Sequence, residues 1–465
     1  MLSPDVGFAT FLPFVIRRIH MNHADGIWHR SCLSACMEEE SMLDWSAYES
    51  YGAGDAYAQI PANGGAFGKA ASVCIGNRQC QKIEKGVMCP SYRATGDEVH
   101  STRNRAAALK AMLEGRYSLS GPELDRAMDL CLGCKGCKRE CPNGVDMALL
   151  KTEYLARRWK KEGVPFRYRI FGSLPRYVRH MKRFAFLLRI RNRIPFLAKC
   201  AEMLTGISER RAIPIPKKSF LKDAPAVSGS GKEVVLFVDT FSNHFDPEIA
   251  EAALEVLENA GCRVHVAKSE RPLCCGRTYL SSGMVIEARK EARRLVEFLY
   301  PFSEKEIPVI GLEPSCLLML RDEYHSLGLG EKAQKVSKSA LLFEEFLARE
   351  KLDLSPLPFR KILVHGHCHQ KAFGAMKAMK KVLSMIPELE AEFVESSCCG
   401  MAGSFGMEAE HYEISMKMAE LSLLPKLREA GADVLLVSNG TSCRQQAGSG
   451  IHLSMLLRMA LRKNS

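Results

Sequence analysis

Two stretches in the second half of the chain share one pattern of apolar and polar residues. Short apolar segments alternate with longer segments in which apolar residues recur every three or four positions. The first kind of segment is typical of buried strands, and the second is typical of amphipathic helices. Strands that alternate with helices predict parallel βαβ units, so we expect a duplicated α/β cysteine-rich domain with repeats at residues 231–350 and 351–465.

Each repeat is predicted to contain three strands and two helices in the same order. In the first repeat the strands lie at 234–238, 263–267 and 308–312, with helices at 248–260 and 285–300. In the second repeat the strands lie at 362–365, 392–395 and 434–438, with helices at 371–385 and 408–424. This architecture places its ligands at the carboxyl ends of the strands.

The first half of the chain predicts a different, largely helical organisation. Ser101 can cap a helix that runs to Leu113, and a second helix should begin near Pro122 and lead to Cys131. We expect a poorly structured leader at residues 1–65, a ferredoxin-like domain at 66–160 and a basic helical linker at 161–230.

The linker is strongly basic, is interrupted by prolines, and alternates arginines with aromatic residues at 166–169 and 183–186. One interpretation is a set of short helices with a solvated basic face. The other is a surface that docks on an acidic partner or on anionic lipid at a membrane surface. We do not expect nucleic acid as a partner, because no nucleic-acid-binding motif accompanies the charge.

Composition changes this picture through the cysteines. The chain has 465 residues, of which 18 are cysteine, and its formal net charge is +12 with every thiol counted as neutral. Most cysteines lie in tight clusters and no secretory signal precedes them, which favours bound metal over disulfides. The apolar stretch from Phe8 to Ile16 contains Pro13 and is too short to span a membrane. We therefore expect a cytoplasmic protein, peripheral at the inner membrane if the linker binds lipid, with Met21 as an alternative start.

One cysteine run follows the spacing C-x2-C-x2-C-x3-C-P of bacterial ferredoxins. Its members are Cys131, Cys134, Cys137, Cys141 and Pro142. Three thiolates on one tight loop can bind three irons of a 4Fe-4S cluster, while the fourth thiolate binds a neighbouring cluster. A structural zinc site is the alternative, although zinc motifs usually consist of two separated pairs.

A second run completes an α+β, largely helical, two-cluster ferredoxin-like domain. It consists of Cys74, Cys80 and Cys89, which precedes Pro90. Cross-ligation then predicts one cluster on Cys131, Cys134, Cys137 and Cys89. The other cluster is left with Cys74, Cys80 and Cys141, because Asn77 stands where another cysteine belongs. That cluster is a three-iron form, a four-iron form with a non-cysteine ligand, or absent.

Each α/β repeat contains a Cys-Cys-Gly loop and a later cysteine. The candidate metal ligands are Cys274, Cys275, Cys316, Cys368, Cys398, Cys399 and Cys443. Adjacent cysteines can offer two thiolates to one metal centre, and the glycine permits close approach of the backbone. Buried structural cysteines are the alternative. Three interpretations are open for the histidines His365, His367 and His369. They are polar residues at a strand end, they are zinc ligands, or they carry protons near a redox centre.

These motifs resemble the cysteine-rich iron–sulfur family, over about residues 66–460. The segments that carry the resemblance are CPSYRAT at 89–95, STR at 101–103, PLCCGRT at 272–278, LEPSC at 312–316, HGHCHQK at 365–371 and SSCCGMAG at 396–403. The family includes iron–sulfur subunits of glycolate oxidase, lactate oxidation and anaerobic glycerol-3-phosphate dehydrogenase, and the catalytic subunit of heterodisulfide reductase. The chain looks most like the C-terminal half of FAD-linked 2-hydroxyacid dehydrogenases of the D-lactate or D-2-hydroxyglutarate type. It departs from the family pattern at Ser242, Glu313 and Gly440, where further cysteines are expected.

The resemblance implies an electron relay from a reduced flavin, through 4Fe-4S clusters, to a quinone or another acceptor. The chain has no Gly-rich dinucleotide fingerprint after a strand, so we expect a separate FAD-linked dehydrogenase subunit to supply the electrons. Two alternatives stay open. One is a self-standing disulfide or quinone reductase that uses the Cys-Cys-Gly centre, and the other is a non-catalytic iron–sulfur module.

Overall fold

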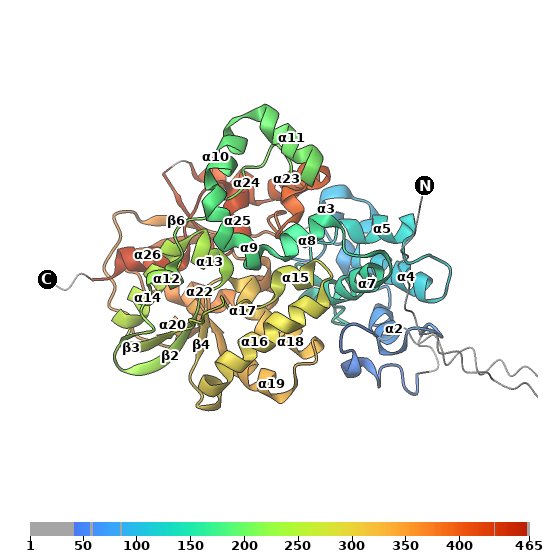
Figure 1. Cartoon of the computed structure of the whole chain (residues 1–465), viewed down its shortest axis with the longest axis horizontal. Coiled ribbons are helices and arrows are strands. Elements are labelled where there is room, and N and C mark those ends of the chain that lie inside the picture. The colour runs from blue at the N-terminus through green and yellow to red at the C-terminus, as the bar shows by residue number, and fades with distance from the viewer. Residues whose placement is uncertain (1–40, 56–58, 84–85, 432, 463–465) are drawn as a thin grey trace, which may run out of the picture. The chain divides into compact units, whose positions relative to one another are not determined.

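Helices and strands are divided unevenly along the chain (Figure 1). The computed structural model describes residues 41–55, 59–83, 86–431 and 433–462, which belong to one compact unit. Within the described residues before 227, every regular element is helical, and strands begin only at β1 (Val227–Gly229). Residues 1–40 of the predicted leader lie outside the described residues.

The region that carries the ferredoxin cysteines is built from short helices, which are α2 (Gly65–Ser72), α3 (Pro90–Thr95), α4 (Thr102–Leu113), α5 (Pro122–Asp129), α6 (Gly136–Glu140) and α7 (Met147–Glu162). The two predicted helices are confirmed as α4 and α5. Ser101 caps α4, since its hydroxyl accepts a hydrogen bond from Asn104 N at 3.3 Å. The helical character is therefore as expected, and the detailed ferredoxin-like fold stays a prediction.

Part of the stretch expected as a poorly structured leader is packed against α7. Leu43 and Trp45 are buried, and the 3-10 helix Ser46–Tyr48 follows them. The carboxylate of Glu153 accepts hydrogen bonds from Met42 N at 3.0 Å, Leu43 N at 2.9 Å and Trp45 Nε1 at 3.3 Å. It also accepts one from Arg157 Nε at 2.8 Å. A buried carboxylate needs several such donors, so these contacts fix this stretch of chain.

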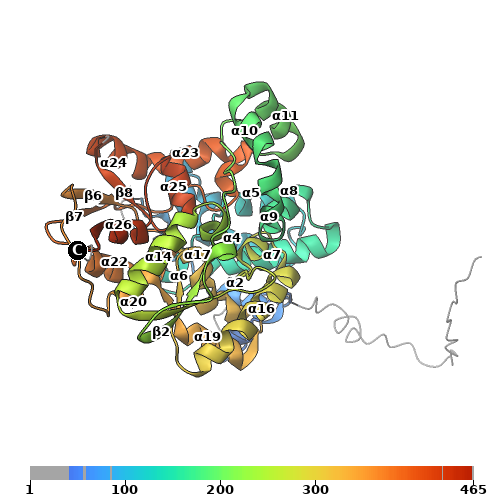
Figure 2. The same cartoon turned by 60° about the vertical axis from the view of Figure 1, so that its left-hand side comes forward.

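The basic linker forms the set of short helices that its sequence predicts, namely α8 (Phe166–Gly172), α9 (Leu174–Met181), α10 (Ala185–Arg193), α11 (Pro195–Thr205) and α12 (Phe220–Asp223). Pro175 and Pro195 occupy the first turns of α9 and α11, where the missing N–H costs no hydrogen bond. Helices α10 and α11 extend away from the sheets (Figures 1 and 2). Throughout the described ranges, every helix is too short or too polar to cross a membrane.

The first repeat contains a five-stranded sheet in the order β1-β3-β2-β4-β5. Its strands are β1, β2 (Lys232–Phe237), β3 (Cys262–Val266), β4 (Val309–Gly311) and β5 (Ala340–Leu342). All neighbouring pairs are parallel except β1 with β3. The helices of this repeat are α13 (Thr240–His244), α14 (Pro247–Asn259), α15 (Arg277–Ser281), α16 (Val285–Glu304), α17 (Pro314–Arg321), α18 (Glu323–Ser326), α19 (Gly330–Ser339) and α20 (Phe343–Leu347).

The second repeat contains a parallel three-stranded sheet in the order β7-β6-β8. Its elements are β6 (Lys361–Val364), α21 (Cys368–Ala372), α22 (Met376–Leu383), β7 (Glu390–Phe393), α23 (Tyr412–Glu420), α24 (Leu423–Ala430), β8 (Leu435–Val437), α25 (Thr441–Ala447) and α26 (Leu453–Ala460). The two helices predicted for this repeat are each divided. Gly374, with φ +75°, lies in the turn that separates α21 from α22.

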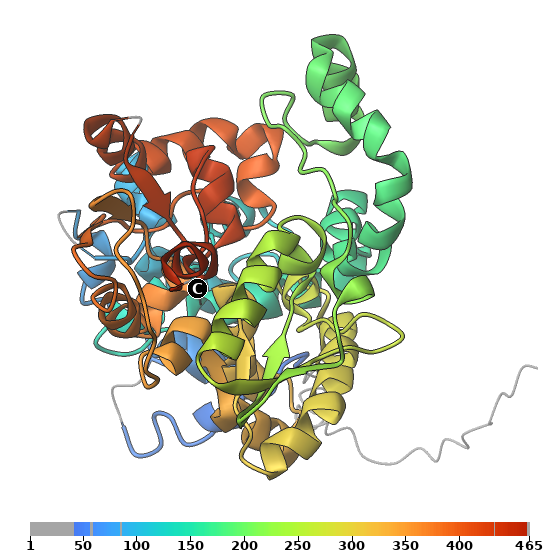
Figure 3. The same ribbon diagram turned by 90° about the vertical axis from the view of Figure 1, so that its left-hand side faces the viewer.

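The two repeats share one apolar core. Val234 and Ile310 of the first sheet belong to the same cluster of buried residues as Ile362 and Val437 of the second. Helix α26 packs on α14, and the Ser454 hydroxyl donates to Ile249 O at 2.9 Å. The repeats therefore lie side by side (Figure 3), with their strand ends close to each other. The predicted parallel βαβ architecture is confirmed.

We predict that Glu153→Ala destabilises the protein, because it removes the partner of buried Arg157 and the acceptor for two backbone N–H groups. Loss of one member of a buried ion pair typically costs about 3–5 kcal/mol. Urea unfolding followed by tryptophan fluorescence measures the change. The matched control is Glu162→Ala on the same helix, whose carboxylate pairs with Arg158 at the surface. Equal stability of the two variants would contradict the role given to Glu153.

Candidate metal centres

Four of the ferredoxin cysteines line one cavity. Cys89, Cys131, Cys134 and Cys137 all contribute to its wall. Cys89 precedes α3 in a left-handed conformation, with φ +49°. Its sulfur accepts a hydrogen bond from Thr102 N at 3.2 Å, so the start of α4 holds this thiol in place. This is the set that cross-ligation between the two runs predicts.

The spacing of these four thiols suits a cluster better than a single metal ion. Thiolates bound to one zinc at about 2.3 Å lie within roughly 4 Å of one another. Among the described residues, no three of these four thiols belong to a set whose ligand atoms all lie within 4.8 Å. A polynuclear centre separates its ligands more widely than a single ion does.

The remaining ferredoxin cysteines form a second, incomplete set. Burial raises the pKa of the Cys74 thiol, and the nearby thiols of Cys80 and Cys141 add to this effect. Asn77, which replaces a cysteine, uses its side chain locally. Its amide donates to Asn143 Oδ1 at 3.1 Å and its oxygen accepts from Gln79 N at 3.0 Å. The thiols of Cys80 and Cys141 are therefore near enough to Cys74 to affect its pKa, and Asn77 has a role in shaping the loop.

In the second repeat, four cysteines converge from the ends of its three strands, as predicted. Contacts with the thiols of Cys368 and Cys399 raise the pKa of Cys398 well above its ordinary value. Contact with the thiol of Cys398, and then with that of Cys443, lowers the pKa of Cys399 well below it. All four thiols are buried. They therefore form one continuous group of sulfur atoms.

His365 lies beside the thiols of the second repeat, and one of its ring nitrogens makes no hydrogen bond within the described part of the chain. Its Nδ1 lies 3.1 Å from Ser396 Oγ, while its Nε2 is buried and has no hydrogen-bond partner in the described part of the chain. One ring nitrogen of His365 lies within 4.8 Å of the Cys399 and Cys443 sulfurs. Buried polar atoms are rarely left unpaired, so this nitrogen fits a group bound between the thiols. The set of His365, Cys399 and Cys443 could bind either a single metal ion or one edge of a cluster.

The places where the family pattern has further cysteines are filled in a specific way. A Cβ atom at Gly440 would lie 2.3 Å from His367 Cδ2, so the absence of a side chain there makes room for the imidazole. His367 also caps α21, since its Nδ1 accepts from His369 N at 3.1 Å. Glu313 accepts from Ser315 Oγ at 2.9 Å and from Thr441 N at 2.9 Å. The Gly440–His367 contact thus lies within the second repeat, whereas the Glu313–Thr441 contact joins the two repeats.

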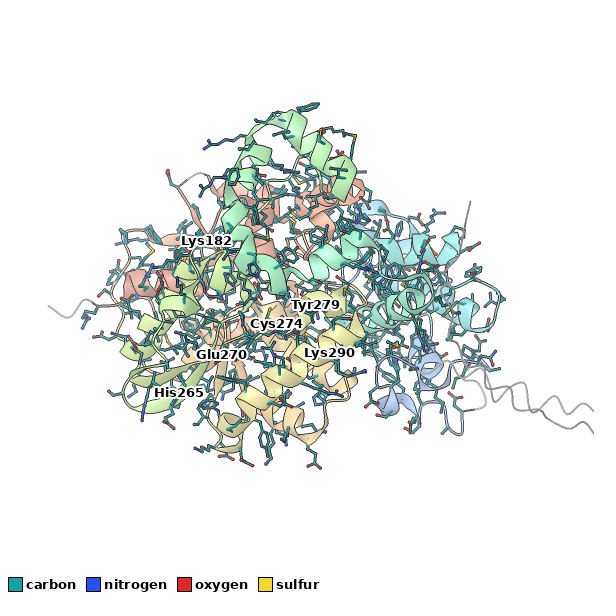
Figure 4. All side chains as sticks on the ribbon, viewed as in Figure 1. Lys182, His265, Glu270, Cys274, Tyr279 and Lys290 are labelled. Atoms are coloured by element: carbon teal, nitrogen blue, oxygen red, sulfur yellow. The ribbon has the colours of Figure 1, made fainter. Side chains whose placement is uncertain are left out.

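The first repeat brings together three thiols, those of Cys274, Cys275 and Cys316. The pKa of Cys275 is raised well above its ordinary value in this buried group, and its thiol contacts both of the others. Ser242 replaces the fourth cysteine, and its hydroxyl donates to Asp239 Oδ2 at 2.8 Å. Figure 4 marks Cys274 beside Tyr279 of α15. This set is therefore smaller than that of the second repeat.

The four-cysteine cavity of the ferredoxin region lies directly beside the cysteines of the second repeat. Cys134 and Leu132 pack against the apolar cluster that contains Cys368, Cys398, Cys399 and Cys443. Helix α6, which follows Cys134, contacts α21, which begins at Cys368. Burial raises the pKa of the Cys134 thiol, and the nearby Cys368 thiol is the next largest cause.

A chain of buried charges connects the same loops. Lys135, which follows Cys134, is 1% exposed and pairs with Asp146 at 2.8 Å, Asp322 at 2.8 Å and Glu323 at 3.3 Å. Glu323 also pairs with Arg277 of the first Cys-Cys-Gly loop. Arg277 Nη2 in turn lies 3.1 Å from His369 Nε2, next to Cys368. Sequence reasoning missed this chain, although a lysine inside the ferredoxin run and an arginine after Cys-Cys-Gly mark it.

Comparison with known proteins agrees with the arrangement of the thiols. Residues 70–145 match the 4Fe-4S dicluster domain, and residues 237–321 and 362–446 each match the cysteine-rich domain. The chain therefore joins a 4Fe-4S dicluster domain to two cysteine-rich domains. It is an iron–sulfur electron-transfer protein, and 4Fe-4S clusters are its cofactors. The number of clusters in this chain depends on the incomplete sets described above.

Three relatives illustrate the family. D-2-hydroxyglutarate dehydrogenase of Escherichia coli is 23% identical over 442 residues, which cover 82% of this chain and 43% of the relative. One subunit of the anaerobic glycerol-3-phosphate dehydrogenase of Escherichia coli is 31% identical over 233 residues, or 49% of this chain and 56% of the relative. Lactate utilization protein A 1 of Bacillus mycoides is 29% identical over 222 residues, or 45% of this chain and 86% of the relative. The chain thus spans about half of the length of the first two relatives.

We predict that Cys137→Ser removes about four iron atoms per chain after anaerobic reconstitution, because a 4Fe-4S cluster loses one of its thiolates. Iron analysis and visible absorption measure the loss. Cys200→Ser is the matched control, since Cys200 lies on α11 in the linker, apart from every thiol set. Equal iron content in the two variants would show that Cys137 is not a cluster ligand.

Proposed function

We propose that the chain carries electrons from a flavoprotein 2-hydroxyacid dehydrogenase to a quinone or another acceptor. The observation that carries this proposal is the packing of Cys134 against the thiol group of the second repeat. Electron tunnelling slows steeply with distance, so two adjacent redox centres exchange electrons far faster than two separated ones. We assign Cys89, Cys131, Cys134 and Cys137 to one cluster, and Cys368, Cys398, Cys399 and Cys443 to the next.

When bound, 4Fe-4S clusters accept and release single electrons, so they can divide the electron pair of a reduced flavin. The chain's own residues keep these sites dry and balance their charge. Lys371 is held by Ser396 O at 2.9 Å and Ser396 Oγ at 2.7 Å, beside the thiols of the second repeat. Buried cations at this position stabilise the added negative charge of a reduced centre.

The flavoprotein partner is inferred from what the chain lacks and from its relatives. The chain shows no dinucleotide-binding fingerprint. It aligns with less than half of a D-2-hydroxyglutarate dehydrogenase, and one relative is named as a subunit of a dehydrogenase. We therefore propose that a separate FAD-linked dehydrogenase subunit oxidises a 2-hydroxy acid, with D-lactate, glycolate and D-2-hydroxyglutarate as the substrates to test.

The test combines the reconstituted protein with an FAD-linked D-2-hydroxyacid dehydrogenase of its own organism under anaerobic conditions. We expect the substrate to bleach the cluster absorption only when the flavoprotein is present. Bleaching without the flavoprotein would favour a self-standing reductase at the Cys-Cys-Gly centre. Intact clusters that no flavoprotein reduces would contradict the relay and favour a non-catalytic module.

The linker helices support a second proposal, that the chain docks on the surface of a membrane that contains anionic lipid. Phe196 on α11 is 74% exposed and Leu204 is 80% exposed, and Phe184 at the start of α10 and Phe186 within it are more than half exposed. Lysines and arginines recur through residues 166–204, where Glu202 is the only acidic residue. Exposed aromatic and aliphatic side chains beside basic ones are typical of helices that lie in the lipid headgroup region. A membrane position would also bring the chain to a quinone.

We expect the protein to bind vesicles that contain phosphatidylglycerol, and to bind them less at high salt because the attraction is partly electrostatic. Co-sedimentation measures the bound fraction. The double variant Phe196→Glu with Leu204→Glu should lose most of the binding. Met459→Glu is the control, because Met459 is 52% exposed on α26, away from the linker. Equal binding of both variants, or of vesicles without anionic lipid, would contradict membrane docking by these helices.

A further inference from the structure

A second cavity, with a volume of about 100 Å³, lies beside the four-cysteine cavity and shares Cys131 with it. Its walls come from four parts of the chain. They are the loop before Cys134 together with α7, Tyr168 of α8, residues 277–281 and Glu323 of the first repeat, and residues 402–411 of the second repeat. Helices α7, α8 and α15 lie near one another in Figure 1.

Several hydrogen-bonding groups reach this cavity. Lys151 Nζ donates to Cys131 O at 2.8 Å and to Asp129 O at 3.3 Å. An ammonium group has three N–H donors, so one of them stays free for a ligand as far as the described residues show. Tyr168 lines the same space. These donors lie next to the backbone of a cluster ligand, where an electron acceptor would have to bind.

His411 forms a polar part of the wall that is connected to solvent. Its ring nitrogens lie 2.9 Å from Glu408 Oε2 and 2.9 Å from Asp129 Oδ1. Burial alone would lower the pKa of His411, but its hydrogen bonds to Asp129 and Glu408 raise it to about 9. The side chain of Asp129 is 53% exposed. The imidazole therefore holds a proton at neutral pH and reaches water through an exposed carboxylate.

The charges and apolar groups of the cavity favour a flat, neutral ligand. Its three cationic side chains, Lys151, Arg277 and His411, face three carboxylates, which belong to Asp129, Glu323 and Glu408. This balance gives no net attraction for a dicarboxylate or a phosphate. Apolar wall is supplied by Leu149, Leu155, Leu280 and Phe405, and the Phe405 ring stacks on His411 with centroids 4.2 Å apart. A ring with carbonyl acceptors fits between such walls and donors.

We propose that this cavity binds the headgroup of a quinone, an inference that rests on the proposed relay. One quinone takes two electrons, one at a time, from the centre held by Cys131, and two protons from water, and leaves as the quinol. The electrons originate from the reduced flavin of the dehydrogenase partner. Lys151 donates a hydrogen bond to one carbonyl oxygen, and both protons come from solvent.

The test uses the reconstituted full chain, reduced with dithionite so that no flavoprotein is needed. Stopped-flow absorption follows reoxidation of the clusters by a water-soluble naphthoquinone and, separately, by ferricyanide. Ser281 is exposed and lines the cavity, and its hydroxyl donates to Thr278 O at 3.1 Å. Ser281→Trp should fill the cavity and slow naphthoquinone reoxidation by about tenfold, equivalent to roughly 1.4 kcal/mol of lost binding. Ser281→Leu should have a smaller effect and Ser281→Ala almost none.

The matched control is Ser384→Trp. Ser384 is also exposed, also ends a helix and also donates to a carbonyl three residues earlier, Lys381 O at 2.8 Å, but it lies outside the cavity. This control should react like the unchanged protein, and ferricyanide should reoxidise all variants at one rate. A reoxidation rate that saturates with naphthoquinone concentration in the unchanged protein, but not in Ser281→Trp, would support the site. Equal rates of reoxidation by naphthoquinone for Ser281→Trp and Ser384→Trp would overturn the quinone site and leave the proposed relay intact. If the flavoprotein fails to reduce the clusters but these rates differ as expected, only the proposed relay is contradicted.

Discussion

The ammonium group of Lys135 is the contact on which the arrangement of cysteine loops depends. It lies in the middle of the ferredoxin run and is buried among the carboxylates of Asp146, Asp322 and Glu323. An unpaired charge at this depth would be strongly unfavourable, so Lys135 holds α7 and the start of α18 against the ferredoxin loop. Through Glu323 and Arg277 the same chain reaches His369, beside Cys368. Three cysteine loops, distant in sequence, are thereby held in one place.

This arrangement gives the thiol sets an order in space. Cys80 contacts Cys89, so the incomplete set of Cys74, Cys80 and Cys141 adjoins the four-cysteine cavity. That cavity adjoins the second repeat through Cys134. The basic residues around these sites fit the negative charge that iron–sulfur centres bring. The positive formal charge of the chain is therefore partly a counterpart of its cofactors.

The sequence predicts the elements that have a strong local pattern. The six predicted strands, the cap at Ser101 and the convergence of cysteines at strand ends are as expected, because the period of apolar residues and the spacing of ligands are local properties. Strands β1 and β5 of the first sheet are additional to the predicted ones. The division of helix 371–385 depends on Gly374 in a turn, and strand β5 has only three residues, so neither has a clear periodic signal. The pairing of Lys135 with Glu323 and the cavity beside Cys131 arise from contacts between distant segments, which no local pattern encodes.

The central claim is that adjacent sets of thiols hold iron–sulfur centres close enough to exchange electrons. Electron paramagnetic resonance of the fully reduced, anaerobically reconstituted protein tests this most directly. The account predicts 4Fe-4S signals that are broadened or split by magnetic interaction between the centre at Cys89, Cys131, Cys134 and Cys137 and the centre of the second repeat. Signals that are a simple sum of isolated clusters, or a protein that holds only zinc, would contradict it.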